Sequence, residues 1–142
     1  MKKAFTLVEI LVVVTIISLL ASVAAVSYSQ FVKQSRDTKR RTDIEQIRAA
    51  VELYRNFDAN GEYPASVTFG TGEIKDASAT YLSTVPNDPL SSQTYTYYYG
   101  SLSANKDYLI CAYLEGGGTM TSPPSCGPSP CNYCMGPYGK KQ

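Results

Sequence analysis

The residues that could do chemistry are few in this sequence, and four cysteines are the most prominent of them. Cys111, Cys126, Cys131 and Cys134 all lie in the last third of the chain. An even, clustered set of cysteines is typical of disulfides in an exported protein, whereas in the cytosol it indicates a zinc site. Two disulfides among four cysteines allow three pairings. The cysteines alone therefore leave both disulfides and zinc open.

Groups for catalysis are scarce. The chain has no histidine, which removes the commonest general base and metal ligand. Its 13 basic and 12 acidic residues give a net charge of +1, so no global field points to nucleic acid. The carboxylates of Asp88, Asp107 and Glu115 are too dispersed along the sequence to predict a calcium site. We therefore expect no enzyme, no catalytic residue, no bound metal or cofactor, and no small-molecule substrate.

Glu9 is the other residue whose setting is unusual. It is the single charge in the apolar run from Phe5 to Val26. As a helix this run spans about 33 Å, enough to cross the hydrocarbon core of a bilayer. A carboxylate in such a segment is costly and by default marks a functional site with a partner. Lys2 and Lys3 precede the run and favour a cytoplasmic N-terminus.

An ordinary secretory signal is the alternative reading of the N-terminus, and Ser22-Val23-Ala24 could serve as its cleavage site. The apolar region of such a signal usually has about 7 to 15 residues, and this run is longer. A plain signal also gains nothing from a carboxylate near its start. A membrane-anchoring helix is the better interpretation.

Lys2-Lys3-Ala4 followed by Phe5-Thr6-Leu7-Val8-Glu9 resembles the leader of type IV pilins and type II secretion pseudopilins. The resemblance implies that a prepilin peptidase cleaves between Ala4 and Phe5 and methylates the new amine. It also implies that Glu9 pairs with the amine of a neighbouring subunit. The family usually has Gly before the cut, where this chain has Ala4.

The same resemblance implies partners and a location. The precursor is expected to cross the cytoplasmic (inner) membrane once, in contact with membrane lipid, and to be handled by an inner-membrane assembly platform. It is then expected to enter a homo-oligomeric filament in the periplasm or at the cell surface.

Beyond the membrane span, residues 27–57 predict the second half of one continuous helix that runs from Phe5 to near Phe57. Ile44, Ile47, Val51 and Tyr54 recur at helical spacing and form a stripe that we expect to pack on a globular head. Asp43, Glu45, Arg48, Glu52 and Arg55 are expected on the other faces.

The dense charge run 36–41 has two interpretations. We interpret it as a solvated helix segment that faces neighbouring subunits. Binding of nucleic acid or anionic lipid is the alternative.

Residues 58–142 predict a small head with a two- or three-stranded antiparallel sheet, so the fold class is α+β. The alternation around Tyr97 predicts one strand, the stretch 108–114 predicts another, and residues 100–106 the hairpin loop between them. A short helical turn is expected at 77–82. The Cys-rich tail, residues 119–142, is expected to be an irregular loop, and similarity to pilins implies that Cys111 pairs with a tail cysteine.

The sequence thus predicts a leader at residues 1–4, a transmembrane half-helix at 5–26, a soluble half-helix at 27–57 and a head at 58–142. The predicted function is a structural subunit of a type IV pilus or of a type II secretion pseudopilus. A minor tip pilin that binds DNA, surfaces or a secreted protein is the alternative, and a secreted disulfide-bonded protein without an anchor is a third.

Overall fold

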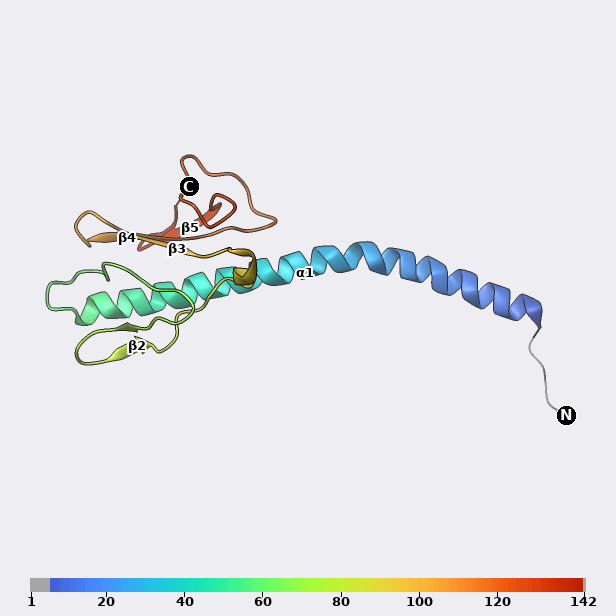
Figure 1. Ribbon diagram of the computed structural model, residues 1–142, viewed down its shortest axis with the longest axis horizontal. Coiled ribbons are helices and arrows are strands. Elements are labelled where there is room, and N and C mark those ends of the chain that lie inside the picture. Colours follow the sequence, from blue (N-terminus) through green and yellow to red (C-terminus); the bar gives the residue numbers. More distant parts are fainter. Residues whose placement is uncertain (1–5, 142) are drawn as a thin grey trace. The chain divides into compact units, whose positions relative to one another are not determined.

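The computed structural model describes residues 6–141, and the chain divides into two compact units, Met1–Ser35 and Arg36–Gln142. Helix α1 (Leu7–Phe57) supplies the described part of the first unit and continues into the second (Figure 1). One continuous helix ending near Phe57 is therefore confirmed. The predicted leader, residues 1–4, and Phe5 lie outside the described residues.

Helix α1 is long because no proline or glycine interrupts the sequence between its ends. It ends where Asp58 follows Phe57. The Asp58 carboxylate Oδ2 accepts the backbone N–H groups of Asn60 and Glu62, at 2.9 and 3.0 Å. Gly61 then adopts a φ of 62°, in the left-handed region that glycine takes at no steric cost. Asn60 and Gly61 thus form the turn that follows the helix.

The second unit contains a four-stranded antiparallel sheet in the order β3-β4-β5-β6, and Figure 1 labels β3, β4 and β5. Its strands are β3 (Tyr98–Leu102), β4 (Asp107–Ala112), β5 (Tyr133–Gly136) and β6 (Gly139–Lys141). A separate antiparallel pair joins β1 (Ile74–Lys75) to β2 (Thr80–Leu82), and a 3-10 turn, η1, covers Ser91–Gln93. The fold class is α+β.

The core lies between the sheet and one face of α1. Ile44, Ile47 and Val51 are fully buried, as the helical stripe predicts, and they belong to one cluster with Tyr108 and Ile110 of β4. Burial of each such aliphatic side chain contributes about 1.5–3 kcal/mol to folding. This cluster holds the sheet on the residues of α1 that belong to the second unit.

Two local predictions in the head are wrong. Residues Thr80–Leu82 form β2 and not a helical turn, because the Asp76 carboxylate accepts the backbone N–H groups of Ser78 and Ala79 and closes a tight turn. The predicted hairpin loop at 100–106 is too long, since β3 extends to Leu102 and pairs with Asp107. The chain reverses through 103–105, three consecutive residues with positive φ.

The tail is also more regular than expected. Residues 133–136 and 139–141 form β5 and β6 and extend the sheet beyond β4. These strands are too short for their alternation to be read from the sequence. In the register of β4 and β5, Cys134 lies directly opposite Cys111, and a disulfide joins the two strands there.

Candidate functional site

Glu9 lies in the first turn of α1, on a surface that is otherwise apolar. The large apolar side chains of α1 from Leu7 to Val23 are each between 47% and 81% exposed in the single chain. Within the described residues, this helix is long and apolar enough to cross a membrane, and its most apolar segment is not buried against the rest of the chain. Glu9 is thus the single carboxylate on an apolar surface that the chain itself leaves uncovered.

The Glu9 carboxylate is held by Thr6, the residue just before the helix. The backbone N–H and the hydroxyl of Thr6 both donate to Glu9 Oε2, at 2.9 and 2.8 Å. The backbone N–H of Glu9 donates in return to the Thr6 hydroxyl oxygen at 3.3 Å. This reciprocal arrangement is a capping box, which satisfies backbone donors at a helix start. It keeps the carboxylate at the very beginning of α1.

Sequence reasoning did not identify Thr6, although a threonine three residues before a glutamate is the capping-box signal. The predicted cleavage residues Ala4 and Phe5 lie outside the described residues. The structure therefore places Glu9 and Thr6 together and leaves the cleavage point a prediction.

The four cysteines form two disulfides. Cys111 is bonded to Cys134, with 4.1 Å between the Cα atoms, and Cys126 is bonded to Cys131, with 5.1 Å. The prediction that Cys111 pairs with a tail cysteine is confirmed. The zinc interpretation is wrong for these residues, because all four sulfur atoms are oxidised. Within residues 6–141 no group of three or more His, Cys, Asp or Glu residues is arranged to hold a metal ion.

The charge run at 36–41 is only partly solvated, and this corrects the sequence interpretation. Arg40 is fully buried. Its guanidinium donates to both oxygens of Asp88 at 2.8 and 3.1 Å, to Asp37 at 2.9 Å and to Glu115 at 3.1 Å. Burial disfavours the charge of Arg40, but the hydrogen bonds and charges of these carboxylates outweigh burial and raise its pKa.

The cluster around Arg40 extends to Arg36, which donates two hydrogen bonds to Glu115 at 2.6 and 2.7 Å. These bonds, followed by those from Arg40, hold the pKa of Glu115 below its ordinary value although burial acts to raise it. Asp37 in turn accepts the backbone N–H groups of Glu115 and Gly116, at 2.9 and 2.8 Å. We call Arg36, Asp37, Arg40, Asp88 and Glu115 the arginine cluster.

The arginine cluster brings together carboxylates that the sequence shows as dispersed, Asp88 and Glu115 among them. They meet on the guanidinium groups of Arg36 and Arg40. The burial of Arg40 could have been predicted from the sequence, because Arg40 lies four residues before Ile44 and so continues the buried stripe.

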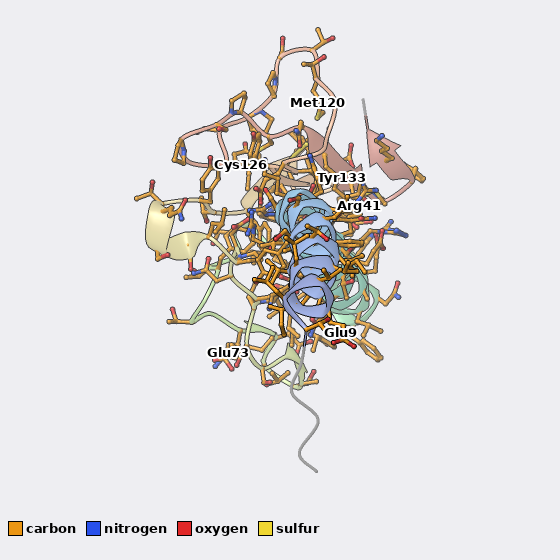
Figure 2. All side chains as sticks on the ribbon, turned by 90° about the vertical axis from the view of Figure 1, so that its right-hand side faces the viewer. Glu9, Arg41, Glu73, Met120, Cys126 and Tyr133 are labelled. Atoms are coloured by element: carbon orange, nitrogen blue, oxygen red, sulfur yellow. A yellow bond between two sulfur atoms is a disulfide. The ribbon has the colours of Figure 1, made fainter. Side chains whose placement is uncertain are left out.

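Two further carboxylates of α1 face the sheet. The Tyr97 hydroxyl donates to Asp43 Oδ2 at 2.7 Å, and the Tyr108 hydroxyl donates to Glu52 Oε1 at 2.8 Å. Asp43 is buried and Glu52 is partly buried, so the predicted positions of both on other faces of the helix are wrong. Arg41, the residue after Arg40, is exposed. Its guanidinium carbon lies 5.0 Å from the centre of the Tyr133 ring, over which it stacks (Figure 2).

Comparison with known proteins gives one match. Residues 1–25 match the family described as the prokaryotic N-terminal methylation motif. Neither a curated protein nor a solved structure matches the chain. The match covers the basic leader, Thr6, Glu9 and most of the apolar run, and it confirms the resemblance seen in these residues.

Proposed function

We propose that this chain, which carries over residues 1–25 the methylation motif that is the hallmark of type IV pilins and pseudopilins, is a non-enzymatic filament subunit. The filament is a type IV pilus or a type II secretion pseudopilus. The observation that carries the proposal is Glu9, a carboxylate on the uncovered apolar surface of α1. Such a group needs a partner, and among residues 6–141 its hydrogen-bond partner is Thr6.

The precursor begins in the cytoplasmic membrane, with α1 crossing it once. The methylation motif implies processing by a prepilin peptidase, and we assign the cut to the bond between Ala4 and Phe5. Cleavage removes Lys2 and Lys3 and exposes a new amine, which the enzyme methylates.

Assembly then exchanges lipid for protein around the apolar part of α1. Lipid tails are as apolar as leucine, so this exchange brings little hydrophobic gain, and packing and polar contacts must direct it. The methylated amine of one subunit pairs with Glu9 of its neighbour. A buried ion pair of this kind specifies register even where it adds little net stability.

The capping box supports this assignment. Before assembly, Thr6 gives the carboxylate two hydrogen bonds, which lowers the cost of holding it in the membrane. Both bonds go to Oε2, and within residues 6–141 Oε1 accepts none, so it is available to a second chain.

The first test is the mass of the mature N-terminus in protein from a membrane fraction. A chain that begins with N-methylated Phe5 is expected. A chain that begins near Ala25 would contradict the proposal, because it would mean ordinary secretion without an anchor.

The second test is the variant Glu9→Ala, with Thr15→Ala as the matched control. Thr15 is also a polar residue on the apolar part of α1, but its hydroxyl bonds only to the Val12 carbonyl of the same helix. Glu9→Ala leaves the neighbour's amine unpaired, a loss of about 3–5 kcal/mol for a buried pair. Sheared filaments are therefore expected to fall by more than about a hundredfold, at about 1.4 kcal/mol per tenfold.

The membrane-inserted monomer should stay at its normal level in both variants, and Thr15→Ala should assemble normally. Normal filament abundance in Glu9→Ala would exclude the proposed role of the carboxylate. Copy number separates this proposal from a minor tip pilin, since a filament body needs many subunits and a tip needs few.

A further inference from the structure

Tyr138 is the most exposed large hydrophobic side chain of the described residues, with 95% of its surface accessible. It lies in the two-residue turn between β5 and β6, after Pro137 and before Gly139. Gly136 pairs with Gly139 across this turn, and Pro137 restricts the backbone before the tyrosine. The hairpin therefore presents a tyrosine ring on a short, constrained tip.

An open cleft of about 300 Å³ lies at the loops that join β4 to β5. Its apolar walls include Tyr113, Met120, Pro123 and Pro130. Figure 2 shows Met120 on the loop at the top of the view. The volume is at the lower end of the range for ligand sites, about 300–1,000 Å³, which suits a single large side chain. An aromatic ring fits these walls, and tyrosine is common at the centre of protein interfaces.

The tip and the cleft lie at opposite ends of one strand. Asn132, which lines the cleft, immediately precedes β5, whereas Tyr138 follows the other end of β5. Four residues of strand separate the two ends by about 13 Å. When the tip and the cleft that receives it lie on different surfaces of one subunit, the contact between copies is head-to-tail. Such contacts generate open filaments when the rotation from one copy to the next does not close a ring.

Charge supports the same pairing. Lys140, two residues after the tip, is exposed. Glu115 lines the cleft and belongs to the arginine cluster, in which two guanidinium groups face three carboxylates, a net charge of −1. The tip that carries Lys140 therefore meets a cleft whose one charged lining residue, Glu115, is acidic when one copy docks on the next.

We propose that Tyr138 of one copy inserts into the cleft around Met120 of the next copy in the filament. The inference rests on the proposed function and adds to it a contact between heads, separate from the Glu9 pair. It assigns a specific role to the C-terminal hairpin and to the loops that the two disulfides close.

The direct test replaces Tyr138 by the photo-crosslinking residue p-benzoylphenylalanine in the full chain, in membranes and in sheared filaments. A dimer whose cross-link maps by mass spectrometry to residues 113–123 of the second copy is expected. A cross-link to another protein or elsewhere on the chain, or none, would overturn the inference.

Variants give an independent measure. Tyr138→Ala is expected to lower filament abundance about tenfold, the effect of an interface residue worth about 1.4 kcal/mol. Tyr138→Phe keeps the ring and should assemble normally. Gly118→Phe should act like Tyr138→Ala from the other side, because a Cβ at Gly118 meets no atom within 4 Å and the residue lines the cleft. Normal assembly of both Tyr138→Ala and Gly118→Phe would overturn the inference.

Failure of the inference and failure of the proposed function give different results. The inference alone fails if filaments depend on Glu9 but give no adduct between residue 138 and the cleft. The proposed function alone fails if the mature chain begins near Ala25, which means secretion without an anchor, and the adduct still forms between copies of that chain.

Discussion

The two parts of α1 each carry a charged residue next to apolar side chains, and the two residues differ in their burial and in their partners. Arg40, in the second unit, is fully buried and receives all its partners from its own chain, including Asp88 and Glu115 far along the sequence. Glu9, in the first unit, lies on an exposed apolar surface, and its described hydrogen-bond partner is Thr6, three residues before it.

The difference separates a charge that is fully paired within the fold from one that we propose takes its partner during assembly. A buried charge with complete pairing fastens segments of one chain together, and removing it leaves its partners unpaired. A charge with one local partner on an uncovered surface contributes little to the fold of the single chain. Mutations at Arg40 and at Glu9 should therefore fail at different stages, folding in one case and filament formation in the other.

The largest expected effect on stability is that of Arg40→Met. The substitution leaves Asp37, Asp88 and Glu115 without their shared guanidinium, so the free energy of unfolding should fall by about 3–5 kcal/mol. Arg48→Met is the control, because the Arg48–Glu45 pair is partly exposed and contributes about 0–1 kcal/mol. Denaturant unfolding of the full chain in detergent, followed by tyrosine fluorescence, measures both. Equal losses in the two variants would break the contrast between Arg40 and an ordinary surface charge.

Loss of a disulfide should have the next largest effect on the free energy of unfolding, and only in the second unit. Replacing Cys111 and Cys134 by Ala opens a crosslink between residues 23 apart and should cost about 3 kcal/mol. Replacing Cys126 and Cys131 opens one between residues 5 apart and should cost about 2 kcal/mol.

The same unfolding measurement ranks the two disulfide variants. Insertion of the first unit into membranes, measured by carbonate extraction, should be unchanged in both. Loss of insertion would show that the two units are not independent.

The smallest effect is expected at alkaline pH. Burial, followed by the hydrogen bond to Asp43, raises the pKa of Tyr97, and burial with the bond to Glu52 raises that of Tyr108. A phenol with a raised folded-state pKa contributes stability that is complete below the ordinary tyrosine pKa of about 10 and declines as pH rises above it. The free energy of unfolding should therefore fall between about pH 10 and 11.

Tyr97→Phe tests this origin. The variant is less stable at pH 8, because Asp43 loses its phenol partner, but its decline above about pH 10 should be shallower than that of the parent chain. An equally steep decline would assign the alkaline effect to other groups.

The sequence by itself determined the features that depend on local chemistry. The apolar run around Glu9 predicts a membrane helix because length and hydropathy decide insertion. The stripe from Ile44 to Val51 predicts the buried face of α1, because a helix repeats every 3.6 residues. Four clustered cysteines predict disulfides in an exported chain.

Tertiary structure alone decided which distant groups meet. Asp88 and Glu115 look isolated in the sequence, and only the docking of their loops on α1 brings both to Arg40. The choice among three cysteine pairings likewise came from the register that sets Cys134 opposite Cys111. The physical reason is the same in both cases. Contacts between residues far apart in sequence are set by the packing of whole elements, which no local pattern encodes.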